Sequence, residues 1–155
     1  MTTPAPDLPI LVVEDSDEDY TALKWALHKI GVTRPLRRCD SADAALAYLR
    51  RADVPPALVF LDLNLGGADG RDLLAAVKSD AALRRIPVVV WTTSAHPADI
   101  DLCYDRGANG YATKPADVEQ LLASLRAVTR YWFDYMVLPD VAPQRAATAP
   151  PARAS

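Results

Sequence analysis

Three short runs of consecutive apolar residues constrain the fold of this chain more than any other feature of the sequence. The runs lie at 10–13, 58–61 and 88–91, and a polar residue follows each one directly. A strand that is apolar at every position has to be covered on both faces, which is typical of a parallel sheet between layers of helices. Weaker strands are predicted at 36–39 and 111–113.

Amphipathic helices are predicted between these strands, because apolar residues recur there at spacings of three and four. The first helix is expected to end at Gly31, the second to follow an N-cap at Ser41, and the fourth to begin at Pro97. Residues 64–70 are rich in glycine and are interpreted as a loop. Five strands that alternate with five helices predict an α/β fold, a doubly wound five-stranded parallel sheet.

The composition of the 155-residue chain is that of an ordinary folded domain. Its net charge is −3 without a basic run, and no segment reaches the roughly 18 apolar residues of a membrane span. We therefore expect a cytoplasmic protein that binds neither nucleic acid nor a membrane. The predicted organisation is a tail at 1–7, one domain at 8–138 and a disordered Pro- and Ala-rich tail at 139–155. Cys39 and Cys103 are interpreted as packing residues, since two cysteines make no disulfide framework.

Polar side chains follow the predicted strands at the edge where an open parallel sheet forms its sites. They are Glu14 and Asp15 after the first strand, Asp62 after the third, Thr92 at the end of the fourth and Lys114 after the fifth. Each residue alone is more often a turn, cap or surface residue, so the functional interpretation depends on their meeting at one edge. Two carboxylates about 4 Å apart repel each other by about 4 kcal/mol, and a hard divalent cation removes that cost.

A magnesium site is therefore predicted at this edge. Asp15 and Asp62 are the candidate direct ligands, and the carbonyl of Asn64 can reach the same ion. Glu14 is expected to act through water. Beside the metal, a carboxylate oxygen of Asp62 can attack phosphorus and form an aspartyl phosphate. The ammonium and hydroxyl groups at the same edge are then expected to bind the phosphoryl oxygens.

Four motifs at these strand ends resemble the response-regulator receiver family, which has the CheY-like fold. The motifs are VVED (12–15), LDLNLGGADG (61–70), PVVVWTTS (87–94) and GYATKP (110–115). The similarity extends over about residues 8–130. It implies the strand order 2-1-3-4-5 and phosphorylation of Asp62 by a histidine kinase in a two-component phosphorelay. The chain would then be a phosphoacceptor that assists its own phosphorylation and dephosphorylation, not an enzyme.

The same resemblance implies roles for the other residues of the site. By this resemblance Glu14, Asp15, Asp62 and Asn64 hold Mg²⁺, and Thr92 and Lys114 bind the phosphoryl oxygens. Tyr111 occupies the aromatic switch position of the family and is expected to rotate when Thr92 shifts toward the phosphate. The Lys114–Pro115 peptide bond is expected to be cis.

A closer resemblance is to the stand-alone response regulators that are paired with phytochrome histidine kinases. It rests on the segments VVEDSDEDY, RIPVVVWTTS and RYWFDYMVLP. It implies a bacterial phytochrome as the kinase and, with no output domain expected after the receiver, signalling through conformational change and protein contact. Trp25 lies off the apolar stripe of the first helix and is a candidate for docking the kinase, whereas Tyr20 fits a docking role and a core role equally well.

The apolar face of the last helix continues past Val128 into a group of large side chains. The group consists of Tyr131, Trp132, Phe133, Tyr135 and Met136. So many large side chains cannot all face one small core. One interpretation is a lid over the sheet. The interpretation that we favour is a homodimer surface, because aromatic residues and Met are enriched at interface centres. By the family resemblance, this dimer uses the fourth helix, the fifth strand and the fifth helix.

Three other functions fit parts of this pattern. A phosphatase of the haloacid dehalogenase type needs a second aspartate two residues after the nucleophile, and this chain has Asn64 there. A flavodoxin-like binder of a flavin phosphate needs hydrogen-bond donors in its first loop, where the acidic residues at 14–19 would repel an anion. A degenerate receiver that serves only as a scaffold would lack part of the chemical constellation, and here all five groups are present.

Overall fold

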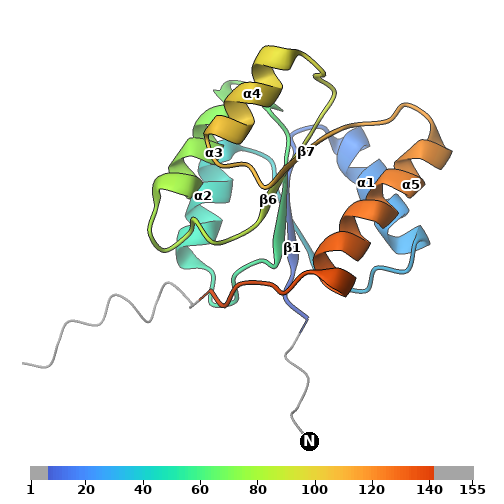
Figure 1. Cartoon of the computed structure of the whole chain (residues 1–155), viewed down its shortest axis with the longest axis horizontal. Coiled ribbons are helices and arrows are strands. Elements are labelled where there is room, and N and C mark those ends of the chain that lie inside the picture. Colours follow the sequence, from blue (N-terminus) through green and yellow to red (C-terminus); the bar gives the residue numbers. More distant parts are fainter. Residues whose placement is uncertain (1–6, 142–155) are drawn as a thin grey trace, which may run out of the picture.

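Five parallel strands form a central sheet with helices on both faces (Figure 1). The structure is a computed structural model, and it describes residues 7–141. The strands are β1 (Ile10–Val13), β2 (Leu36–Cys39), β3 (Leu58–Leu61), β6 (Val88–Thr92) and β7 (Gly110–Thr113). Their order is β2-β1-β3-β6-β7, and every neighbouring pair is parallel. This confirms the predicted fold class and the predicted order of the five strands.

Five α-helices connect the strands in two layers. The helices are α1 (Asp17–Lys29), α2 (Ala42–Arg51), α3 (Gly70–Ser79), α4 (Pro97–Asp105) and α5 (Val118–Arg130). Helices α1 and α5 cover one face of the sheet, and α2, α3 and α4 cover the other (Figure 1). Ser41 caps α2 and Pro97 opens α4, as predicted. Helix α1 ends before Gly31, whose φ of 90° is a left-handed conformation that favours glycine.

Two apolar clusters, one on each face, bury the sheet. Successive side chains of a strand point to opposite faces, so Ile10 packs with α1 and α5 whereas Leu11 packs with α2 and α3. Cys39 and Cys103 are buried free thiols in the cluster under α2 and α3, which confirms their packing role. Burial of each large aliphatic side chain contributes about 1.5–3 kcal/mol, so the core holds the strand ends in fixed positions.

The glycine-rich segment after β3 is not simply the predicted loop, because it contains a small hairpin. Strands β4 (Asn64–Leu65) and β5 (Ala68–Asp69) pair antiparallel across a two-glycine turn. The first glycine of the turn, Gly66, has a φ of 55°, which explains why this position carries no side chain. The hairpin returns the chain so that α3 begins next to the end of β3, where the amide of Gly70 donates to the carbonyl of Leu63 at 2.9 Å.

The last helix changes its hydrogen bonding before it ends. Helix α5 is followed by η1 (Tyr131–Tyr135), a π-helical turn in which the amide of Met136 donates to the carbonyl of Tyr131 at 2.9 Å. Trp132 and Phe133 pack against the cluster under α1 and α5, whereas Tyr131, Tyr135 and Met136 are between 40% and 67% exposed. The five large side chains therefore divide between the core and the surface.

The segment after η1 crosses to the other face of the sheet at the bottom of the view in Figure 1, where Val141 packs on the cluster under α2 and α3. The disorder predicted for 139–155 stays a prediction, since residues 142–155 of that tail and residues 1–6 lie outside the described residues.

One prediction about the backbone needs correction, and it concerns the Lys114–Pro115 bond. It was expected to be cis, but residues 7–141 contain no cis peptide bond, so the bond has the trans form that X–Pro bonds favour by about 0.5–1 kcal/mol. Within the same residues, no helix is long and apolar enough to cross a membrane.

Candidate functional site

The carboxyl ends of β1, β3, β6 and β7 bring the predicted site residues to one edge of the sheet. Glu14 and Asp62 directly follow β1 and β3, and backbone pairing continues into both residues, because Glu14 donates to the carbonyl of Cys39 at 3.0 Å and Asp62 donates to that of Val13 at 3.1 Å. Both acids are buried, with 3% and 7% of their surface exposed. The sheet therefore holds these two carboxylates in fixed positions below the surface.

Lys114 is the centre of the site. Its ammonium group donates to Asp62 Oδ2 at 2.8 Å and to Asp19 Oδ2 at 2.7 Å, and it also contacts Glu14 Oε1. One oxygen from each of these three carboxylates lies within 4.8 Å of the others. One cation therefore faces three acids, and the fully ionised cluster carries an excess of two negative charges.

The electrostatic environment separates the two buried carboxyl groups. Burial, together with the neighbouring Asp62 carboxylate, raises the pKa of Glu14 from 4.5 to about 7. Burial alone would also raise the pKa of Asp62, but its neighbours Glu14 and Lys114 and the hydrogen bond from the Asn64 amide outweigh it and hold that pKa below its usual value. Asp62 is thus the carboxylate that favours the ionised, nucleophilic form, whereas Glu14 binds a proton more readily.

Two of the predicted metal ligands are arranged differently from the rest. The carboxylate of Asp15 is exposed and lies outside the cluster around Lys114. It faces the hairpin turn, since a Cβ atom added to Gly66 would lie 3.0 Å from Asp15 Oδ2. Asn64 contacts Asp62 through its backbone, whose amide donates to Asp62 Oδ1 at 3.2 Å.

Asp19 is the member of the cluster that sequence reasoning missed. It belongs to the acidic run that begins at Glu14, but it lies on α1 rather than at a strand end, and the strand-end argument therefore did not select it. Its position in the first turn of α1 places it at the same edge, because α1 begins there with Ser16 as its cap. The clue available in the sequence was the length of the acidic run beyond the first strand.

Two buried oxygen atoms in the site have no hydrogen-bond partner among the described residues. They are Glu14 Oε2 and Thr92 Oγ1, and Thr92 is completely buried. An unpaired buried polar atom costs about 1–3 kcal/mol, so each atom marks a place where a ligand would be stabilised. The donor set at this edge consists of carboxylate oxygens and one amine, and hard divalent cations such as Mg²⁺ and Mn²⁺ prefer oxygen ligands of this kind. The residues present therefore fit a divalent cation.

Comparison with known proteins identifies the family. A sequence profile described as the response regulator receiver domain matches residues 10–126. The chain belongs to this receiver family. A receiver domain is the phosphoacceptor of a two-component system and not a conventional enzyme, which agrees with the ionised, buried Asp62 beside Lys114.

Individual relatives cover nearly the whole receiver. Response regulator Rcp1 of Synechocystis sp. is 34% identical over 135 residues, which make up 84% of this chain and 92% of Rcp1. The structure of the phosphorylated cyanobacterial phytochrome response regulator RcpA is similar with a TM-score of 0.80 and 37% identity, over 86% of this chain and 99% of RcpA. The Mn²⁺-bound form of Rcp1 has a TM-score of 0.79 and 33% identity, over 86% and 99% of the two chains. This receiver is thus a homologue of phytochrome response regulators, and one of them is known in a Mn²⁺-bound form.

Tyr111 and Thr92 lie on neighbouring strands of this receiver. Tyr111 is partly buried against the cluster under α2 and α3, and its hydroxyl donates to the carbonyl of Ser94 at 2.9 Å. Ser94 belongs to the loop that leaves β6 directly after Thr92. The predicted switch residue is therefore connected to the backbone that carries the predicted phosphoryl-binding hydroxyl.

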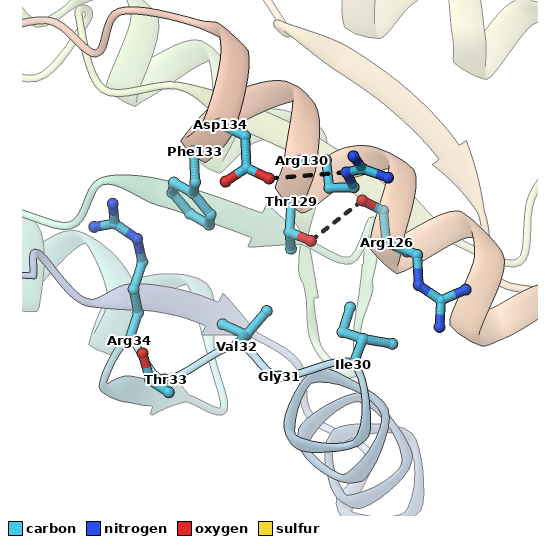
Figure 2. Close-up of a pocket in the computed structure, with 10 residues that line it drawn as sticks. All are labelled: Ile30, Gly31, Val32, Thr33, Arg34, Arg126, Thr129, Arg130, Phe133 and Asp134. Carbon is cyan, nitrogen blue, oxygen red and sulfur yellow. Dashed lines mark hydrogen bonds and ion pairs between the residues drawn. The ribbon is translucent and has the colours of Figure 1, made fainter.

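A cavity of about 370 Å³ lies away from the phosphoacceptor edge, where α1 and α5 end (Figure 2). Arg34 stacks on the ring of Phe133 there, with 4.1 Å from the guanidinium carbon to the ring centroid, and Arg130 faces Asp134 at 3.8 Å. Arginines at this place complement the negative ends of the helix dipoles. We therefore attribute the charge of this cavity to the stability of the two helix ends.

Proposed function

We propose that Asp62 accepts a phosphoryl group from a histidine kinase, with a bacterial phytochrome as the donor and Mg²⁺ as the metal. The observation that carries the proposal is the contact of 2.8 Å between Asp62 Oδ2 and the Lys114 ammonium inside a buried acidic cluster. This arrangement keeps one carboxylate ionised and places a positive charge where phosphoryl oxygens would arrive.

In the proposed transfer, a carboxylate oxygen of Asp62 attacks the phosphorus of the kinase phosphohistidine. The new P–O bond forms as the P–N bond breaks, and the bonding pair returns to the imidazole nitrogen. The Lys114 ammonium, which donates to the Asp62 carboxylate before transfer, can donate to the phosphoryl oxygens after it. Hydrolysis of the aspartyl phosphate by water later releases inorganic phosphate and restores the carboxylate.

The proposed metal ligands are Asp15, Asp62 and the carbonyl of Asn64, with Glu14 acting through water. Asp19 joins this set as a neighbour, since its carboxylate lies within 4.8 Å of those of Glu14 and Asp62. When bound, Mg²⁺ supplies positive charge that offsets the repulsion between the carboxylates and the incoming phosphate. The carboxyl groups of Glu14 and Asp15 would provide the oxygen atoms that retain the cation.

The proposed output is a change in the loop after β6. The Thr92 hydroxyl has no partner among residues 7–141 and would gain one by donating to a phosphoryl oxygen. Movement of this backbone disturbs the carbonyl of Ser94, which accepts from Tyr111, so rotation of Tyr111 follows from the same displacement. The face of β7, α4 and α5 would carry the signal to a protein partner in the cytoplasm.

A homodimer is part of the proposal. The exposed side chains of Tyr131, Tyr135 and Met136 form an apolar patch at the end of α5, next to the face built from α4, β7 and α5. Trp132 and Phe133 were predicted to belong to the interface, but they pack largely inward and would support the patch from below. Aromatic side chains and Met at a patch of this kind favour a second copy of the chain as the partner.

Phosphotransfer to Asp62 is tested by mass spectrometry after incubation with Mg²⁺ and either acetyl phosphate or a phosphorylated phytochrome kinase. We expect one acid-stable, alkali-labile phosphoryl group on the wild type and on Asp43→Asn, an exposed carboxylate on α2 that serves as the control. The Asp62→Asn variant should remain unlabelled. Equal labelling of the Asp62→Asn variant would contradict the proposed acceptor, and labelling by acetyl phosphate but not by the phytochrome would contradict the proposed donor.

The dimer is tested by light scattering of the full chain with and without phosphorylation. A double substitution of Tyr135→Ser and Met136→Ser should shift the equilibrium to monomer. Trp25→Ser is the matched control, because Trp25 is a similarly exposed aromatic residue, at 46%, on α1. A wild type that stays monomeric at all concentrations up to the tens of micromolar range would refute the dimer without affecting the phosphoacceptor proposal.

A further inference from the structure

Arg71 connects the two loops that border Asp62. It is the second residue of α3, and its amide and its Nη1 atom both donate to Asp69 Oδ1 at 2.9 Å. Asp69 ends the hairpin that follows Asp62. Across the gap to α4, Arg71 Nη2 and Nε donate to Asp99 Oδ1 at 2.6 and 3.2 Å. One guanidinium group therefore joins the phosphoacceptor hairpin to the first turn of α4.

Asp99 also connects Arg71 to the loop after β6. Its second oxygen, Oδ2, accepts from the hydroxyl of Ser94 at 2.6 Å, and the Ser94 hydroxyl in turn accepts from the amide of His96 at 3.3 Å. The loop is held at another point, because the carbonyl of Ser94 accepts from Tyr111. Ser94 is thus fixed through its side chain toward Arg71 and through its backbone toward Tyr111.

The network is sheltered enough to hold its geometry. The side chains of Arg71 and Asp99 are 19% and 24% exposed, far less than the 80% exposure of Asp72 on the same helix pair. The hydrogen bonds from Ser94 and Arg71 lower the pKa of Asp99, so this carboxylate stays ionised and paired. The planar guanidinium group presents its donors in a rigid fork, which fixes the relative positions of the two carboxylates.

Thr92, the residue directly before this loop, carries a hydroxyl oxygen that would gain a hydrogen bond by moving. Thr92 Oγ1 is buried and lacks a partner among the described residues, although a phosphoryl group on Asp62 would provide one. Any shift of Thr92 toward Asp62 pulls on Ser94, only two residues further along the chain. The contacts of Ser94 with Asp99 and Tyr111 oppose that shift.

We propose that Arg71 is a positioning residue that holds the loop at 93–96 in its resting place through Asp99 and Ser94, and so opposes the movement of Thr92 toward a phosphorylated Asp62. This inference rests on the proposed role of Asp62 as the acceptor. It gives Arg71 a function that its distance in sequence from Thr92 does not suggest. Removing the guanidinium group releases the loop and favours the phosphoryl-bound state.

The test uses beryllofluoride with Mg²⁺ as a phosphoryl mimic and the tryptophan fluorescence of the full chain as the signal. Trp91 reports on the site, because it is buried in β6 directly before Thr92. Arg71→Gln and Asp99→Asn should each lower the apparent Kd for beryllofluoride about three- to tenfold. The double variant should match either single variant, because both substitutions remove the same contact.

The control is Arg106→Gln. Arg106 pairs with Asp72 at 3.4 Å and so also joins the end of α4 to α3, but within residues 7–141 neither side chain forms a hydrogen bond or ion pair with the loop after β6. It should leave the apparent Kd unchanged. An unchanged or higher Kd for Arg71→Gln, or an equal decrease for Arg106→Gln, overturns the inference.

Hydrogen exchange of the metal-free protein separates this inference from the proposed function. Peptides that contain residues 93–96 should exchange faster in Arg71→Gln than in the wild type and in Arg106→Gln. If the wild type binds no beryllofluoride, the proposed function fails, and the exchange result alone still decides whether Arg71 holds the loop. Equal exchange in all three proteins overturns the inference even if beryllofluoride binds.

Discussion

Substitution of Gly70 by alanine is expected to destabilise this receiver and to slow phosphorylation, because α3 begins against the backbone of the phosphoacceptor turn. A Cβ atom at position 70 would lie 2.3 Å from the carbonyl oxygen of Asp62 and 2.8 Å from the Cα atom of Leu63. Carbon and oxygen atoms normally approach no closer than about 3.3 Å, so the start of α3 or the turn at Asp62 has to move by about 1 Å.

Two effects of opposite sign make this substitution informative. Alanine is preferred over glycine within a helix by about 0.5–1 kcal/mol, so an unobstructed Gly70→Ala change would stabilise α3. Overpacking against a backbone that cannot yield costs about 1–3 kcal/mol. We therefore expect a net loss of about 1–2 kcal/mol in the free energy of unfolding. A displacement of about 1 Å at Asp62 would also slow phosphorylation by acetyl phosphate by up to about 100-fold.

Urea unfolding measures the first effect, and the midpoint should fall while the slope of the transition stays constant. Gly67→Ala is the matched control, since a Cβ atom at position 67 meets no atom within 4 Å in the same hairpin. It should leave both stability and phosphorylation close to those of the wild type. A Gly70→Ala variant that is as stable as the wild type, or more stable, would show that α3 does not approach Asp62 so closely.

Three further predictions concern polar side chains that are buried or partly buried. Because the pKa of Glu14 is raised from 4.5 to about 7 mainly by burial, its contribution to stability is complete below pH 4.5 and is lost as the pH rises through about 7. Urea midpoints in EDTA should therefore fall between pH 5 and pH 8 by an amount corresponding to at most about 3 kcal/mol, and Glu14→Gln should flatten this dependence. Lys78→Ala should lower the free energy of unfolding by about 2 kcal/mol, because the Lys78 ammonium donates to two backbone carbonyls and to Asn109 Oδ1 at 2.7–3.0 Å; a midpoint equal to that of the wild type would contradict this. Thr92→Val should stabilise the unphosphorylated protein by about 1 kcal/mol in the same assay and weaken beryllofluoride binding, and a destabilised variant would show that the hydroxyl is already satisfied.

The fold could be predicted because its signals are local. Each apolar run ends at a polar residue, and the run at 58–61 became β3 with the predicted bounds. Ser41, Pro97 and Gly31 act through the conformations that their own side chains or backbones allow, so neighbouring sequence is enough to interpret them. The hairpin at 64–69 escaped prediction because its strands are two residues long, too short for any periodicity to register.

The site could be predicted only as far as strand ends determine it. Glu14, Asp62 and Lys114 follow strands, so the topology of the sheet is sufficient to bring them together. Asp19 reaches the same lysine from a helix, and its contribution depends on how α1 packs against the sheet. The role of Arg71 is harder still to predict, because it depends on contacts with the hairpin and with α4 that form only in the packed structure.

The residues that sequence reasoning placed most securely are also those that weaken the unphosphorylated fold. Thr92 and Glu14 are almost completely buried, yet each carries an oxygen without a partner among residues 7–141, and burial makes the ionisation of Glu14 unfavourable. A protein selected only for stability would fill such positions with apolar side chains. These polar residues are useful if a cation and a phosphoryl group bind their unpaired oxygens. The stabilisation that is missing in the unphosphorylated fold is then gained in the phosphorylated one. Contacts such as that between Arg71 and Asp99 set how much of this stabilisation is needed to move the loop after β6.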